Sequence, residues 1–310
     1  MDVVRIDPDQ PVRWPSPVVA VGNLDGVHRG HQALVAAAVG EARRRRGTAV
    51  VLTFDPHPAR VVAPERAPRA LTTFDQKAEI LAGLGLDRLA VLPFTPALAR
   101  VPPEQFVRDV LGTGLGARVV AVGASFRFGQ GRAGDTALLE ELGRRLGFDV
   151  LTLDPVLLDG APVSSTRVRE ALEAGAVEEA ARLLGRRHFV DGTVVAGDGR
   201  GRTIGFPTAN LEPVNETLPG HGVYACWARL PGEPGKRPAA VNVGRRPTFA
   251  GADVTVEAHL LDFAGDLYGH RLRLEFERRL RPERKFEGVE ALQAQIQADL
   301  AQARDLLRGP

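Results

Sequence analysis

A single segment, residues 17–35 with the sequence PVVAVGNLDGVHRGHQALV, constrains the fold more than any other. Its apolar run 18–21 is continuous and largely β-branched, which is typical of a strand buried in a parallel sheet. Residues 22–26 contain two glycines and predict a turn. Residues 32–43 are rich in alanine and predict a helix. A strand that passes through a tight turn into a helix indicates an α/β domain.

Two histidines three residues apart, His28 and His31, lie where this turn meets the helix. The first N–H groups of a helix are unpaired, and its dipole favours an anion there. Gly30 allows a phosphate to approach the backbone closely. We therefore expect a phosphate site. H-x-x-H with Asp25 is also compatible with a metal site, but that site needs further ligands, and the single Cys226 is distant in sequence.

The composition is that of an ordinary soluble protein, with 44% apolar and 25% charged residues. A chain of 310 residues is long enough for two domains. No apolar run reaches the length of a membrane span, and the first residues lack the pattern of a secretory signal. One cysteine excludes an internal disulfide and fits a reducing compartment, so we predict a cytoplasmic protein.

The charge pattern does not indicate nucleic-acid or membrane binding. The net charge is only +2, and the basic and acidic residues that give a pI near 9.0 are interspersed. The arginine run at 43–46 is explained by the end of a helix, where cations suit the dipole. We predict small-molecule partners, with no nucleic acid and no membrane; whether the chain has a protein partner is not indicated by the sequence.

The first half of the chain alternates predicted strands and helices. This alternation is typical of a parallel sheet with helices on both faces, and such sheets bind ligands at the carboxyl ends of their strands. Strands are predicted at 18–21, 48–54, 88–94, 119–122 and 148–153, and helices at 32–43, 75–84, 103–111, 135–146, 165–173 and 177–184.

The pattern changes after residue 184. Residues 271–278, RLRLEFER, alternate apolar and charged side chains, as a half-buried strand does. Residues 254–261 alternate likewise, which places Glu257 and His259 on one face. Several such strands predict a small antiparallel barrel.

The last residues, 289–307, carry apolar side chains at helical spacing. They predict an amphipathic helix that covers the barrel. We place the boundary between the two domains near residues 185–187, which gives an α/β domain at 1–185 and a β-barrel domain at 186–310.

Two further segments of the first half follow predicted strands. TFDPHP at 53–58 contains prolines that stiffen a loop and present His57, although a rigid loop alone explains them too. GASFRFGQGRAGD at 123–135 combines glycines with Phe126 and Phe128. This combination suits an aromatic ligand with a phosphate, and phenylalanines packed beside a glycine loop explain it equally well.

A third segment, VSSTRVR at 163–169, places Ser165 and Thr166 at a predicted helix start. Hydroxyl side chains there commonly cap the helix. Arg169 follows about one turn later, and its guanidinium can bind a phosphate together with these hydroxyls.

The second half of the chain contains a different set of candidate site residues. GDGRGRTIGFPTAN at 197–210 is a glycine-rich loop that lacks the ending of the common phosphate loop. Thr208 and Asn210 are hard oxygen donors at alternate positions, which suit Mg²⁺ that retains several waters. Glu257 is the candidate base, although a glutamate on a barrel strand is usually only solvent-facing.

Taken together, these segments resemble the bacterial bifunctional riboflavin kinase/FAD synthetase family. GNLDGVHRGHQ is similar to the family's GxFDGVHxGH, and TFDPHP, FRFG and SSTRVR follow as in its adenylyltransferase half. GRTIGFPTAN, LPGHGVYA, NVGRRPTF and VEAHLLDF follow as in its kinase half. The similarity covers nearly the whole chain, in family order.

The resemblance implies a nucleotidyltransferase-like α/β domain followed by a flavokinase β-barrel with a C-terminal helix. It also implies two reactions: riboflavin and ATP give FMN, and FMN and ATP give FAD and pyrophosphate. Flavins are then substrates and products rather than redox cofactors, and Mg²⁺ accompanies ATP.

The resemblance also implies the site residues. Those of the adenylyltransferase would be Gly22, Asn23, His28, Gly30, His31, Ser165, Thr166 and Arg169 for the nucleotide, and His57, Ser125, Phe126 and Phe128 for the flavin. Those of the kinase would be Gly199, Gly201, Thr208 and Asn210 for the nucleotide, Thr208 and Asn210 for Mg²⁺, and Glu257 as the base. His28 and His31 would act in catalysis.

Two positions depart from the family pattern. Leu24 stands where the family commonly has Phe, which should change packing and not chemistry. Ser125 stands where an acidic or amide residue is common, which puts the FMN affinity of the first domain in doubt.

Two alternatives stay open on the sequence alone. One is a nucleotidyltransferase for another phosphorylated substrate, such as a pantetheine or nicotinate mononucleotide, against which the PTAN segment and Glu257 count. The other is a non-catalytic flavin- or nucleotide-binding module, against which the two phosphate motifs and the candidate base count.

Overall fold

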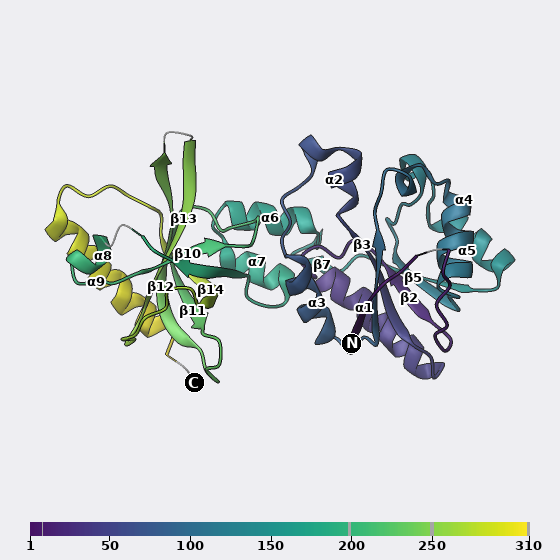
Figure 1. Ribbon diagram of the computed structural model, residues 1–310, viewed down its shortest axis with the longest axis horizontal. Coiled ribbons are helices and arrows are strands. Elements are labelled where there is room, and N and C mark those ends of the chain that lie inside the picture. The colour runs from purple at the N-terminus through teal and green to yellow at the C-terminus, as the bar shows by residue number, and fades with distance from the viewer. Residues whose placement is uncertain (8, 198–199, 249–250, 309–310) are drawn as a thin grey trace. The chain divides into compact units, whose positions relative to one another are not determined.

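The computed structural model describes residues 1–7, 9–197, 200–248 and 251–308, which form two compact units, Met1–Ser164 and Ser165–Pro310 (Figure 1). The second unit starts with helices α6 (Ser165–Glu173) and α7 (Val177–Leu184). The sequence-based boundary near residues 185–187 instead leaves these two helices with the first half. The limits of the functional domains therefore stay a prediction.

The first unit contains a six-stranded sheet in the order β1-β4-β3-β2-β5-β6, and every neighbouring pair is parallel. The strand order reverses between β2 and β5, where open α/β sheets bind their ligands. The strands are β1 (Asp2–Arg5), β2 (Val18–Val21), β3 (Ala49–Asp55), β4 (Arg88–Pro93), β5 (Val119–Gly123) and β6 (Asp149–Leu153), with a separate hairpin of β7 (Leu157–Leu158) and β8 (Ala161–Pro162).

Helices cover both faces of this sheet because successive strand residues point to opposite sides. Val18 and Ala20 of β2 pack in the cluster that contains α1 and α3, whereas Val19 and Val21 pack in the cluster that contains α4 and α5. The helical segments are α1 (Arg29–Arg44), α2 (Pro58–Val62), α3 (Phe74–Ala82), α4 (Pro103–Phe106), η3 (Val107–Gly114, with π-type turns) and α5 (Thr136–Leu146), with short 3₁₀ turns η1 (Pro64–Arg66), η2 (Leu98–Arg100) and η4 (Gln130–Arg132).

The second unit contains a closed barrel in the order β10-β13-β12-β11-β14-β9, with every pair antiparallel. Its interior holds the rings of Tyr224 and Phe276, which meet edge to face at 5.3 Å. The strands are β9 (Phe189–Val195), β10 (Ala209–Pro213), β11 (Gly222–Arg229), β12 (Arg237–Thr248), β13 (Gly251–Leu260) and β14 (Arg271–Arg281).

Besides α6 and α7, the second unit contains α8 (Arg200–Thr203) and α9 (Val289–Leu306). Ala303 of α9 packs against Ala225 and Ala240 on the outer face of β11 and β12, which confirms that the terminal helix covers the barrel. Val289 was expected among the apolar residues that face the barrel. It is instead 57% exposed, and it is the first residue of α9. Among the described helices, none is both long and apolar enough to cross a membrane.

Candidate functional site

The turn after β2 brings the two motif histidines together at the start of α1. His28 is the N-cap, and its Nδ1 accepts the backbone N–H of His31 at 3.4 Å. The two rings stack with centroids 3.6 Å apart and planes at 17°. A Cβ added at Gly30 would lie only 3.1 Å from the His28 ring, so a side chain there would crowd the imidazole. The helix begins at Arg29 rather than at residue 32 because His28 caps it.

The environment of His31 favours its neutral form. Burial, the charge of His28 and the charge of Lys77 lower the pKa of His31 well below its usual value, and burial is the largest cause. Its buried Nδ1 has no hydrogen-bond partner within the described chain. A buried polar nitrogen without a partner is costly in a structural role and is a common feature of a site that binds a ligand.

The turn itself is strained, which is frequent at functional sites. Leu24 and Val27 have φ of 50° and 42°, in the left-handed region that non-glycine residues rarely adopt. The Asp25 carboxylate anchors the turn, since it accepts the backbone N–H groups of Leu71 at 3.0 Å and Thr72 at 3.4 Å. Asp25 is therefore engaged in structure, and no group of three metal-ligating side chains occurs among the described residues. These contacts favour the phosphate interpretation over the metal one.

Lys77 of α3 is a residue of this site that the sequence analysis missed. Its Nζ donates to the carbonyl of Asn23 at 2.9 Å, and Thr53 Oγ1 donates to the same oxygen at 3.2 Å. The side chain is 9% exposed and forms no ion pair with a described carboxylate. Burial lowers its pKa, which the charges of Asp25 and Asp55 partly offset.

His57 lies beside the same turn. Its Nε2 is 3.3 Å from Asn23 Nδ2, and its Nδ1 accepts the backbone N–H of Ala59 as the N-cap of α2. The TFDPHP loop is thus joined to the β2–α1 turn. Gly22, which precedes Asn23, leaves room for the buried Leu24, because a Cβ there would approach that side chain to 3.2 Å.

The segment expected to bind flavin follows β5, which pairs with β2. Ser125 is exposed and Phe126 is half-buried, whereas Phe128 is only 6% exposed. The rings of Phe126 and Phe128 stack at 5.5 Å, and Phe128 also contacts Phe106 at 6.0 Å. Phe128 is therefore a core residue that supports Phe126.

The hydroxyl motif lies at the junction of the two compact units. The carbonyl of Val163, which precedes the motif, lies 3.7 Å from where a Cβ of Gly30 would stand. Ser165 opens α6, and Thr166 and Arg169 lie one turn apart on that helix, hence on one face. The assignment of these three side chains to the ATP phosphates stays a prediction.

In the barrel, three polar side chains meet on neighbouring strands. Glu257 of β13 is paired with Asn210 of β10 on one side and with Asn242 of β12 on the other. All three are half-buried and face away from the buried Val256 and Val241. Asn242 was not singled out from the sequence, where it appears only as part of the NVGRRPTF segment.

Glycines allow the loop before β10 to approach these residues closely. A Cβ at Gly197 would overlap the side-chain amide of Asn210. A Cβ at Gly201 would overlap the Phe206 carbonyl oxygen and lie 3.2 Å from Thr208 Oγ1. Gly199 lies outside the described residues.

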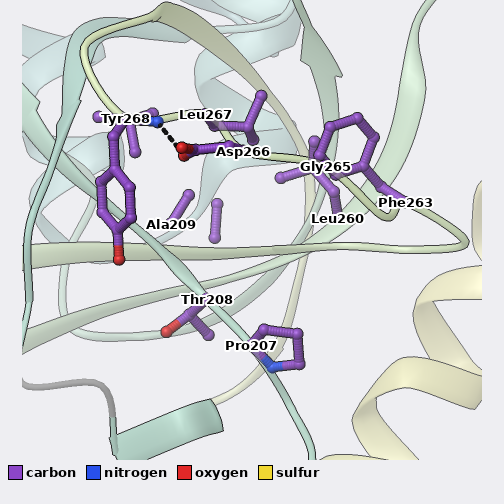
Figure 2. A pocket seen from close by; sticks show the side chains of 11 residues that line it. Pro207, Thr208, Ala209, Leu260, Phe263, Gly265, Asp266, Leu267 and Tyr268 are labelled. Carbon is purple, nitrogen blue, oxygen red and sulfur yellow. Dashed lines mark hydrogen bonds between the residues drawn. The ribbon is translucent and has the colours of Figure 1, made fainter.

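A pocket of 380 Å³ adjoins this loop, which is a volume typical of small-ligand sites. Figure 2 shows Pro207 and Thr208 on one side of it and Asp266, Leu267 and Tyr268 on the other. The backbone N–H of Tyr268 donates to Asp266 Oδ1 at 2.9 Å, which orders the far side. Its wall is mostly apolar, and includes Val194, Ala209, Ala258, Leu260 and Phe263.

Comparisons with known proteins cover both halves of the chain. The FAD synthetase family matches residues 11–167, and the riboflavin kinase family matches residues 184–307. The bifunctional riboflavin kinase/FMN adenylyltransferase of Escherichia coli (strain K12) is 40% identical over 288 residues, 93% of this chain and 92% of that protein. The proteins of the same name from Pseudomonas fluorescens and Bacillus subtilis are 41% and 35% identical, each over more than nine-tenths of both chains.

One solved structure is similar over nearly its whole length. It is described as a macrolide-efflux protein from Streptococcus pneumoniae, and it matches with a TM-score of 0.88 at 30% identity. The match covers 98% of this chain and 99% of that chain.

Proposed function

The chain belongs to the bifunctional riboflavin kinase/FMN adenylyltransferase family, and we propose that its two reactions use two sites with different chemical equipment. The chain phosphorylates riboflavin to FMN with ATP, and it transfers the adenylyl group of ATP to FMN, which gives FAD and pyrophosphate. A nucleotidyltransferase for another substrate and a non-catalytic binding module are not favoured, because both enzyme families match.

The adenylyltransferase site lies at the β2–α1 turn. Its nucleophile is the FMN phosphate, whose second pKa of about 6 leaves it ionised at neutral pH. The site therefore needs no general base, and it must align the phosphate with the α-phosphorus of ATP and stabilise the leaving pyrophosphate. The neutral His31, the capping His28 and the positive end of the α1 dipole stabilise the pyrophosphate charge. Gly22, Asn23 and Gly30 shape the turn, and the sequence resemblance predicts that Ser165, Thr166 and Arg169 also bind the ATP phosphates.

The flavin of this reaction binds beside the β5 end. His57 and Ser125 offer polar contacts, Phe126 offers an aromatic face, and Phe128 supports Phe126 from the core. Because the hydroxyl of Ser125 is shorter than an amide or carboxylate side chain, we expect this chain to hold FMN more weakly than a variant with Asn there.

The kinase site lies on the barrel. Its nucleophile is a ribityl hydroxyl, which is not ionised and needs a base. The observation that carries this assignment is the pairing of Glu257 with Asn210 across β13 and β10, which places a carboxylate beside the PTAN segment. Glu257 accepts the hydroxyl proton, and Thr208 with Asn210 binds the nucleotide. The pocket beside Thr208 is lined by Ala258 and Leu260 of the opposite face of β13 and does not include Glu257.

Mg²⁺ fits the polar side chains of the PTAN segment, of which Thr208 also lines the pocket. Thr208 and Asn210 provide neutral hard oxygens, which suit Mg²⁺ when phosphates and waters complete its shell. The ion would neutralise charge on the phosphates during transfer. Gly201, and Gly199 on the sequence resemblance, let the loop approach the nucleotide.

We also propose a cytoplasmic location, which agrees with a single, buried cysteine, and riboflavin, FMN and ATP as the partners. The test is a time course of the full chain with riboflavin, ATP and Mg²⁺, resolved by chromatography. The expected result is FMN first and FAD afterwards, with both products lost on chelation of Mg²⁺ and restored by its addition. Formation of FMN without Mg²⁺ would contradict the assigned role of Thr208 and Asn210.

A further inference from the structure

A histidine on β13 holds the loop that carries the candidate magnesium ligand. His259 Nδ1 lies 2.8 Å from the carbonyl oxygen of Pro207. Because a carbonyl oxygen only accepts, Nδ1 carries the proton and donates it. The same imidazole meets the Phe206 ring edge to face, with 6.2 Å between centroids. His259 thus contacts two consecutive residues of the loop before β10.

This contact matters because the ladder of β10 starts only at Ala209, which pairs with Ala258. Pro207 and Thr208 precede that ladder, so its hydrogen bonds do not fix them. The proline ring fixes φ of Pro207. A hydrogen bond to the Pro207 carbonyl fixes the plane of the peptide that leads into Thr208. The two constraints together leave Thr208 little freedom to move.

The same strand carries the candidate base. Glu257 and His259 are two residues apart on β13, so they share a face, and Glu257 pairs with Asn210. A single strand therefore presents the group that accepts the proton and the group that holds the metal-binding segment. Any displacement of the loop relative to Glu257 is resisted by the hydrogen bond from His259.

We propose that His259 is a positioning residue of the kinase site, which keeps Thr208 in place relative to Glu257 by holding the Pro207 carbonyl. This inference rests on the proposed kinase site. Its effect is on the binding of Mg-ATP and not on proton transfer itself. The competing explanation is that His259 only packs against Phe206.

Two substitutions separate the hydrogen bond from the packing. In His259→Asn the side-chain amide can donate from nearly the same position as Nδ1, but the ring is lost. In His259→Phe the ring is kept and the donor is lost. Phe206→Leu provides the matched control, because it removes the ring contact and leaves the hydrogen bond to Pro207 in place.

The experiment measures riboflavin phosphorylation by each full-length variant at varied Mg-ATP and at varied free Mg²⁺. We expect His259→Phe to raise KM for Mg-ATP about tenfold, the effect of one lost hydrogen bond, with a smaller change in kcat. His259→Asn and Phe206→Leu should stay within about threefold of the unchanged chain. Adenylylation of added FMN, measured on the same samples, should be unaltered and reports that the first unit is folded. A kcat of phosphorylation close to that of the unchanged chain reports that the barrel is folded.

The proposal is overturned if His259→Phe leaves KM for Mg-ATP unchanged, or if His259→Asn is impaired as strongly as His259→Phe. Thr208→Ala distinguishes failure of this inference from failure of the proposed site. An impaired Thr208→Ala beside a normal His259→Phe refutes the positioning role alone. A normal Thr208→Ala refutes the assigned magnesium site, and with it the reason for holding Thr208.

Discussion

The stacked imidazoles of His28 and His31, 3.6 Å apart, cannot both be protonated without placing two positive charges face to face. His28 Nδ1 is already an acceptor for the His31 N–H, and His31 is pushed toward its neutral form by burial and by nearby charge. His31 therefore acts through a neutral ring at the start of α1. This arrangement suits the binding of a polyphosphate, and no general base is needed because the FMN phosphate is already ionised.

Replacing His31 by Ala should stop FAD formation while FMN accumulates from riboflavin. One donor to the developing charge is typically worth about 10²–10³ in rate. The measurement is FAD formation from added FMN, with riboflavin phosphorylation by the same variant as the control. An FAD rate equal to that of the unchanged chain would refute the assignment of His31.

Replacing Glu257 by Gln should have the opposite outcome. Without the carboxylate the ribityl hydroxyl keeps its proton, and loss of a general base costs about 10²–10⁴ in rate. FMN formation should therefore fall by about that factor, whereas conversion of added FMN to FAD should be largely intact. Loss of both reactions would show that Glu257 is needed for the structure instead.

The charge of Lys77 should determine the pH at which adenylyl transfer is lost on acidification. The groups that face His31 are His28 on its own turn and Lys77 on α3, and those that face Lys77 include Asp25 and Asp55. Because the Lys77 charge lowers the pKa of His31, Lys77→Met should raise that pKa. Activity that needs neutral His31 is then lost at a higher pH as the solution is acidified.

The readout is kcat/KM for FMN against pH, which reports groups of the free enzyme. Lys77→Arg keeps the charge and serves as the control, so its acid limb should lie closer to that of the unchanged chain. If Lys77→Met lowers the rate without moving the limb, Lys77 acts only by holding the Asn23 carbonyl.

His188 should make the barrel acid-sensitive. It is 3% exposed, and burial, with the charge of Arg186, lowers its pKa to about 3 from 6.5. The unfolded chain therefore binds one more proton than the folded chain between these pH values, so stability falls as pH drops below 6.5. The loss between pH 7 and pH 5 should be about 2 kcal/mol.

Denaturant unfolding at the two pH values tests this expectation, with His188→Phe as the comparison. Phenylalanine does not titrate, so its variant should lose about 2 kcal/mol less over the same interval, whatever its stability at pH 7. Equal losses in the two proteins would show that His188 is not the group responsible.

The sequence predicts the elements of the first unit well where their signal is local. Buried apolar runs predict β2 to β5, and α6 and α7 have the predicted ends. β6 lies within the predicted range although its residues are exposed or half-buried. β1 was missed, because a four-residue edge strand, DVVR, carries almost no periodicity. The early start of α1 was missed because histidine is an unusual N-cap, although His28 itself was singled out.

Other features depend on contacts that no local pattern contains. Lys77 reads as a solvated helix residue, and its burial follows from how α3 packs beside the β2–α1 turn. The pairing of Glu257 with Asn210 joins β13 to β10, which are neighbours in the barrel but not consecutive in the chain. The alternation of residues along the strand predicts which face of β13 carries Glu257. Its neighbours Asn210 and Asn242 follow only from the pairing register of the strands.

The most direct measurement of the two-site account is complementation between two defective chains. Purified His31→Ala and Glu257→Gln proteins are incubated with riboflavin, ATP and Mg²⁺, separately and mixed, and FAD is quantified by chromatography. The account predicts negligible FAD from either protein alone and rapid FAD formation from the mixture, because one chain supplies FMN and the other adenylylates it. A mixture that forms no more FAD than the separate proteins would contradict it.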